Sequence, residues 1–155
     1  MRIIKLAIIS FVFLFLVITL ISLLIPSHIR ISKAANFGLK KEAIISLVKN
    51  KESWKQWHPA FMVDNVRWKQ KISFLLLSDT DSIVVWKMEQ PHKNAVINGW
   101  HIYEYPGADS LTVQWYMDFD LPWYPWQKFG SLFYENTYGI MMQQGLQNLK
   151  TIVDK

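Results

Sequence analysis

The stretch SLTVQWYMDF, residues 110–119, alternates between polar and apolar side chains along its whole length. In an extended chain successive side chains point to opposite faces, so the alternation produces one apolar and one polar face. The apolar face consists of Leu111, Val113, Trp115, Met117 and Phe119. This pattern predicts a strand of an antiparallel sheet that buries one face and exposes the other to water.

Further segments have the properties of strands. Residues 71–78 (KISFLLLS) and 82–90 (SIVVWKMEQ) are joined by DTD, and residues 94–105 (NAVINGWHIYEY) lead to 110–119 through PGAD. Both connections are rich in residues that favour tight turns. Earlier in the chain, an alternating segment predicts a strand whose buried face holds Ile29, Ile31, Ala35 and Phe37.

Helical spacing appears on both sides of these strands. Residues 39–50 carry an apolar stripe of Leu39, Ala43, Ile44, Leu47 and Val48, and a short helix in ESWKQWHP (52–59) ends at Pro59. A long helix is predicted from Trp126 or Phe129 to the end, with a stripe of Tyr138, Met142, Leu146, Leu149 and Val153. Because such a helix must bury its stripe, the predicted fold is α+β, a curved antiparallel sheet wrapped around the long C-terminal helix.

The N-terminus contains a segment of a different kind. No charged residue occurs from Leu6 to Ile25, and about 20 apolar residues in a helix span the roughly 30 Å hydrocarbon layer of a bilayer. A cleaved signal peptide has a shorter apolar run, usually about 7–15 residues, and ends at small residues, whereas this run ends in LLIPSHIRIS. We therefore expect residues 1–26 to be a transmembrane anchor and residues 27–155 to form one domain.

The charged residues beside this segment give mixed information about orientation. Arg2 and Lys5 precede it and favour a cytoplasmic N-terminus, whereas Arg30, Lys33, Lys40 and Lys41 follow it and pull the other way. The basic N-terminal region favours a single-pass protein of the cell membrane with its domain outside the cytoplasm. The chain has no cysteine, which excludes disulfides and thiolate sites.

Two stretches carry a family resemblance. IPSHIRISKAANFGLKKEAIISLVKNKESWKQWHP (25–59), directly after the apolar segment, and YGIMMQQGLQNLK (138–150) resemble the opening and the closing helix of START-like proteins of the SRPBCC superfamily, the polyketide cyclase/dehydrase group, in a membrane-anchored bacterial form. The resemblance implies a helix-grip fold in which Trp54 and Trp57 are packing residues. It also implies a lipophilic ligand, although the middle of the chain is about two strands shorter than is usual for the family.

Three functions follow as expectations. The first is a binding module for a hydrophobic or lipid-like molecule, in a cavity between sheet and helix lined by Trp86, Met88, Trp115, Met117 and Met142, with His101 as a further candidate. The second is a scaffold with a filled core. The third, which we favour least, is a cyclase/dehydrase-like enzyme that uses His58, His101 or Tyr103 as a general acid or base.

Other chemistry finds little support in the sequence. The four histidines lack metal-binding spacing, and no cofactor fingerprint occurs, so we expect neither a metal nor a cofactor. Arg67, Trp68 and Lys69 suggest base stacking, but the basic residues stop there, so we expect no nucleic-acid partner. Trp123, Tyr124 and Trp126 suit the interfacial belt of a membrane. The oligomeric state stays open.

Overall fold

The computed structural model of the protein describes residues 2–62, 71–91 and 93–155, and Arg67, Trp68 and Lys69 lie outside them. The helices are α1 (Arg2–Ser22), α2 (Lys41–Lys49), α3 (Trp54–Trp57), α4 (Pro59–Met62), α6 (Pro125–Ser131) and α7 (Ile140–Val153), with a 3-10 turn η1 (Lys51–Ser53) and a π-helical turn η2 (Glu135–Gly139). The strands are β1 (His28–Phe37), β2 (Ser73–Asp79), β3 (Ile83–Glu89), β4 (Val96–Glu104) and β5 (Leu111–Asp120).

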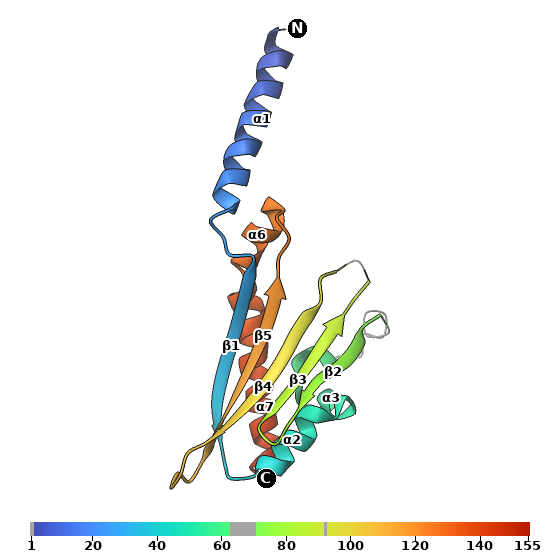
Figure 1. Ribbon diagram of the computed structural model, residues 1–155, viewed down its shortest axis with the longest axis vertical. Coiled ribbons are helices and arrows are strands. Elements are labelled where there is room, and N and C mark those ends of the chain that lie inside the picture. The colour runs from blue at the N-terminus through green and yellow to red at the C-terminus, as the bar shows by residue number, and fades with distance from the viewer. Residues whose placement is uncertain (1, 63–70, 92) are drawn as a thin grey trace.

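The described strands form one antiparallel sheet in the order β1-β5-β4-β3-β2, which curves around α7 (Figure 1). β5 lies beside β1 on one edge and β4 on the other, with Met117 opposite both Ile31 and Asn98. The predicted inner face of β5 is confirmed, since Leu111, Val113, Trp115, Met117 and Phe119 are all buried. The predicted α+β fold is confirmed as well.

Helix α7 packs against the inner face of the sheet and buries the predicted stripe. Met142, Leu146, Leu149 and Val153 are buried, and Tyr138 is half-buried in η2. The prediction of one long helix from Trp126 or Phe129 is wrong in detail. The chain forms α6, then a turn at residues 132–133, then η2 and α7.

Helices α2 and α3 cover the end of the domain that lies away from α1 (Figure 1). Trp54 and Trp57 are fully buried there, and their indole N–H groups donate to the carbonyls of Val48 and Leu47. Asn148 of α7 donates to the carbonyl of Trp57 at 3.0 Å. The two tryptophans therefore fix α3 against both neighbouring helices. Leu39 departs from the expectation, because α2 begins at Lys41 and the Leu39 side chain is exposed.

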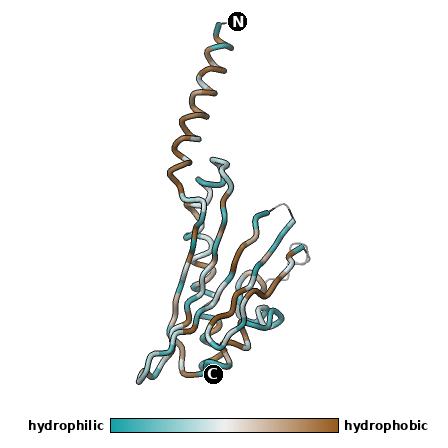
Figure 2. Tube along the Cα trace, in the orientation of Figure 1, coloured by the Kyte–Doolittle hydropathy of each residue, from teal (hydrophilic) through white to brown (hydrophobic). Residues whose placement is uncertain are grey.

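Helix α1 stands apart from the sheet and is apolar along most of its length (Figure 2). It has 21 residues and a mean hydropathy of 2.8, and its side chains are almost all exposed. Among the described residues it is the one helix long and apolar enough to cross a membrane, a property that an N-terminal signal sequence shares.

Candidate functional site

Two adjoining cavities open between the sheet and the start of α7. The outer one lies where β4 begins and β5 ends, and the inner one reaches His58, the residue after α3. The outer cavity has a volume of about 350 Å³ and the inner cavity about 190 Å³. Lys93, Asn94, Val96 and Tyr138 line both, so the two spaces are neighbours. Small-molecule sites usually measure about 300–1,000 Å³, which places the outer cavity at the small end of that range.

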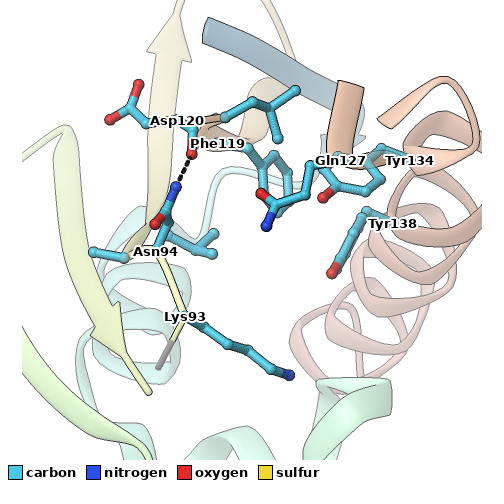
Figure 3. Close-up of a pocket in the computed structure, with 10 residues that line it drawn as sticks. Lys93, Asn94, Phe119, Asp120, Gln127, Tyr134 and Tyr138 are labelled. Atoms are coloured by element: carbon cyan, nitrogen blue, oxygen red, sulfur yellow. Dashed lines mark hydrogen bonds between the residues drawn. The ribbon is translucent and has the colours of Figure 1, made fainter. Parts of the chain in front are cut away.

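The outer cavity has a polar rim. Lys93 and Asn94 come from the β3–β4 connection, Gln127 from α6, and Tyr134 and Tyr138 from the segment before α7. The polar ends of Lys93, Gln127 and Tyr138 project into the space between the strands and the helix (Figure 3). The side-chain amide of Asn94 donates to the carbonyl of Asp120, which holds the β3–β4 connection beside the end of β5.

Tyr138 is a half-buried residue of this rim. Burial, together with the neighbouring Tyr134, raises the pKa of the Tyr138 phenol above its ordinary value. The group is therefore neutral at physiological pH and can both donate and accept a hydrogen bond. A ligand at this rim can therefore meet the amides of Asn94 and Gln127, the phenols of Tyr134 and Tyr138, and the ammonium group of Lys93.

The inner cavity is mostly apolar. Its walls include Met88 at the end of β3, Val96 at the start of β4, Met117 on β5 and Met141 on α7. Methionine side chains are flexible and polarisable, so they adapt to apolar groups of different shapes. The two cavities together offer an apolar floor behind a polar opening.

His58 lies at the base of the inner cavity among aromatic rings. Its ring stacks on Trp54 at 5.6 Å and meets the edge of Trp115 at 4.9 Å. Burial lowers the pKa of His58 to about 3, so its imidazole is neutral near pH 7. The backbone N–H of Ala60 lies 3.2 Å from Nδ1, which assigns Nδ1 as the acceptor and places the ring proton on Nε2.

Beyond His58 the space between sheet and helices is filled with indole rings. Trp100 stacks on Trp115 at 5.3 Å, and Trp54 contacts Trp57, Trp86 and Trp100. Trp115 donates to the side-chain oxygen of Asn98 at 3.1 Å, but three buried N–H donors have no hydrogen-bond partner in the described part of the chain: Trp86 Nε1, Asn98 Nδ2 and Trp100 Nε1. The inner cavity therefore ends at His58, and no tryptophan of the described residues lines either cavity.

The side chains expected from the sequence to line a cavity lie in three places. Met88 and Met117 line the inner cavity, whereas Trp86, Trp115 and Met142 lie in the packed core beside it. His101 lies on the opposite face of the sheet, because it alternates with the inward-facing Trp100 and Ile102. Its ring lies 3.9 Å from that of Tyr103.

Several lining residues were missed by sequence reasoning. Lys93, Asn94 and Gln127 lie in irregular or short segments, where periodicity carries no information about facing. Met141 lies one position before Met142, a member of the predicted stripe, and Tyr134 lies before the π-helical turn that shifts the helix phase. The described residues contain no cluster of three His, Asp or Glu side chains able to hold a metal ion.

The sequence matches no protein-family model and no curated protein sequence. Its structure, however, is similar to solved structures that cover about four fifths of the chain. A START superfamily protein from Mycobacterium smegmatis is 16% identical, with a TM-score of 0.52, over 81% of this chain and 97% of that one. A hypothetical protein from Helicobacter pylori is 14% identical, with a TM-score of 0.56, over 81% and 88%.

The di-domain ARO/CYC protein StfQ from the steffimycin biosynthetic pathway is 7% identical, with a TM-score of 0.58, over 82% of this chain and 51% of that one. This chain therefore spans about half of StfQ. At such identities the likeness concerns the fold alone. The sheet order, the covering helices and these neighbours agree, and the chain has the helix-grip fold of START-like proteins.

Proposed function

We propose that this protein is a membrane-anchored binding protein for a hydrophobic small molecule, which it holds in the two cavities beside α7. The observation that carries the proposal is the pairing of an apolar inner cavity with a polar outer one. A ligand with a hydrocarbon portion and one polar end matches this division. The helix-grip fold supports the proposal, since the neighbours include a START superfamily protein and an ARO/CYC protein.

The dimensions favour a single-chain amphiphile. The inner cavity, about 190 Å³, accepts part of one acyl or isoprenoid chain against Met88, Met117 and Met141. The polar end would then lie in the outer cavity, near Gln127 and Tyr138. Tyr138 sits in a π-helical turn, and such turns are frequent at functional sites.

The positions of the three candidate acid–base residues favour a binding function over a catalytic one. Of the acid–base candidates, His101 and Tyr103 lie on the outer face of the sheet, where the Tyr103 hydroxyl donates to the side-chain oxygen of Gln114 at 2.8 Å. His58 does line the inner cavity, but with a pKa of about 3 it is a weak base near pH 7.

The anchor is the second part of the proposal. We assign residues 1–26 to a transmembrane anchor and residues 27–155 to the START-like domain. Support comes from the length and hydropathy of α1 and from its exposed apolar side chains, which suit lipid better than water. Arg2 and Lys5 favour a domain outside the cytoplasm.

Two neighbouring methionines on α7 test the binding site. Met141 lines the inner cavity, whereas Met142 is fully buried in the core. In phosphatidylcholine nanodiscs, a bound fatty acid, fatty alcohol or isoprenoid should raise the melting temperature of the full wild-type chain, because a ligand of the native state stabilises it. Met141→Trp should fill the cavity and abolish the shift. Met142→Trp should instead overpack the core, at a cost of about 1–3 kcal/mol.

A scaffold with a filled core is the second candidate, and the tryptophan cluster is the observation that favours it. Trp54, Trp57, Trp100 and Trp115 occupy the space that a larger ligand would need. A scaffold would give no melting shift with any ligand of the panel. Met141→Trp would then change only the stability of the protein.

A further inference from the structure

An exposed aromatic cluster lies on the segment that enters α6. Trp123 and Trp126 are 60% and 62% exposed, and Tyr124 between them is 37% exposed. The Tyr124 ring lies 4.9 Å from that of Trp123 and stacks on that of Trp126 at 5.0 Å. We call these three residues the aromatic patch. Large aromatic side chains that gather on a surface usually mark a contact with a partner or a membrane.

The position of the patch relative to α1 is fixed by specific contacts. The ammonium group of Lys128 on α6 is buried and donates to the carbonyl of Ile25 and to the hydroxyl of Ser27, each at 2.7 Å. The backbone N–H of Leu121 donates to the carbonyl of Ser27 at 2.6 Å. Helices α1 and α6 are in contact, and α6 lies at the end of the domain nearest α1 (Figure 1).

These contacts fix the level of the aromatic patch along the axis of α1, and so its depth relative to a bilayer that α1 would span. Ser22 ends the apolar helix, and Leu23 and Leu24 after it are exposed and apolar. If α1 spans a bilayer, this point lies where hydrocarbon meets headgroups. The aromatic patch then lies at the same level, beside the end of the helix. Tryptophan and tyrosine are enriched at this level because their rings are apolar and their N–H and O–H groups are polar.

We propose that the aromatic patch inserts into the bilayer interface and holds the opening of the outer cavity against the membrane. The inference rests on the anchor assigned above. The outer cavity uses the same segment, since Gln127 and Leu121 line it on either side of the patch. A lipophilic ligand can therefore pass between the bilayer and the cavity with little exposure to water.

Quenching by brominated lipid tests the insertion. The full chain is reconstituted into phosphatidylcholine vesicles, either plain or brominated close to the headgroups, and tryptophan fluorescence is compared. Helix α1 contains no tryptophan, so any quenching comes from the domain. We expect brominated lipid to quench the wild type. Trp123→Phe/Trp126→Phe, which keeps the patch aromatic, should lose most of that quenching while remaining folded and bound to vesicles.

A tryptophan at the opposite end of the domain is the matched control. Tyr105 lies in the β4–β5 turn, away from α1, and is 60% exposed. Tyr105→Trp in the double-Phe background should add a tryptophan that aqueous acrylamide quenches but brominated lipid does not.

The other possible results of the quenching experiment distinguish the membrane anchor from the insertion of the aromatic patch. A wild type that floats with the vesicles without quenching overturns the insertion and leaves the anchor intact. Quenching that survives in Trp123→Phe/Trp126→Phe assigns the contact to other tryptophans and overturns it too. Contact between patches of two copies, detected by cross-linking at Trp126→Cys, also contradicts the proposal. A protein that fails to float contradicts both the anchor and the insertion. None of these results depends on whether the cavities hold a ligand.

Discussion

Gly145 of α7 lies directly against the indole ring of Trp115 on β5. A Cβ atom at Gly145 would come within 2.7 Å of a ring carbon of Trp115 and 3.1 Å of Cδ of Pro59. Trp115 is fully buried and packed on Trp57, Trp100 and the His58 ring, so it has no free space into which to move. This close approach lets the helix lie on the sheet, and it closes the core next to the inner cavity.

Gly145→Ala should therefore destabilise the domain. Overpacking costs about 1–3 kcal/mol, which exceeds the roughly 0.5–1 kcal/mol that alanine gains over glycine inside a helix. Gly130→Ala on α6 is the matched control, because the new methyl group would meet nothing within 4 Å beyond its chain neighbours and the backbone of its own helix, and it should be neutral or stabilising. Thermal unfolding of the full chain in detergent, followed by near-UV circular dichroism, compares them. Equal stability of both variants would contradict the close packing.

The lowered pKa of His58 leads to a prediction of how the stability of the domain changes with pH. Its pKa is about 3 in the folded protein and about 6.5 in the unfolded chain, so below pH 6.5 the unfolded state binds a proton that the folded state does not. The contribution of His58 to stability is therefore complete above pH 6.5 and is lost as pH falls towards 3. The expected slope approaches about 1.4 kcal/mol per pH unit.

His58→Asn tests this linkage, because asparagine can still accept the hydrogen bond of Ala60 but does not titrate. Denaturant unfolding between pH 5 and pH 6.5 (roughly the range above carboxylate titration) should show a shallower slope for the variant. The slope is the readout, so a lower absolute stability of the variant does not affect the result. Parallel slopes for wild type and variant would show that His58 does not remain neutral in the fold.

The position of Lys93 leads to a prediction about which polar end group of a ligand the outer cavity prefers. It provides the ammonium group on the rim and extends across the opening towards α7 (Figure 3). Lys93→Met should weaken the binding of a fatty acid more than that of the fatty alcohol of equal chain length, because only the acid carries a charge. Competition with a fluorescent fatty acid in nanodiscs measures both affinities. An equal loss for acid and alcohol would place the polar end of the ligand away from Lys93.

Much of the fold follows from the sequence because it depends on periodic burial. The alternation of β5 and the stripe of α7 both reappear as buried faces, since each element packs against a large apolar neighbour. The break between α6 and α7 could not be predicted, because no proline in residues 132–139 marks the turn or the π-helical segment that shifts the helix phase.

The site was harder to predict than the fold. Met88 and Met117 lie on regular strands, and their facing can be read from the alternation of neighbouring residues. His101 alternates in the same way, but the run from Val96 to Tyr103 mixes apolar side chains on both faces, so its outward orientation appears only in the sheet. Lys93 and Asn94 reach the site through a connection whose path depends on tertiary contacts, such as the bond from Asn94 to Asp120.

The most direct test of the binding function is native mass spectrometry of the full chain, extracted from membranes in mild detergent. We predict that wild-type protein carries an additional mass, which collisional activation releases as a single-chain amphiphile. Met141→Trp should be extracted equally well but carry no such mass, because its indole ring occupies the inner cavity. A wild-type protein that appears only at its bare mass, and whose melting temperature no fatty acid, alcohol or isoprenoid raises, would contradict the binding function.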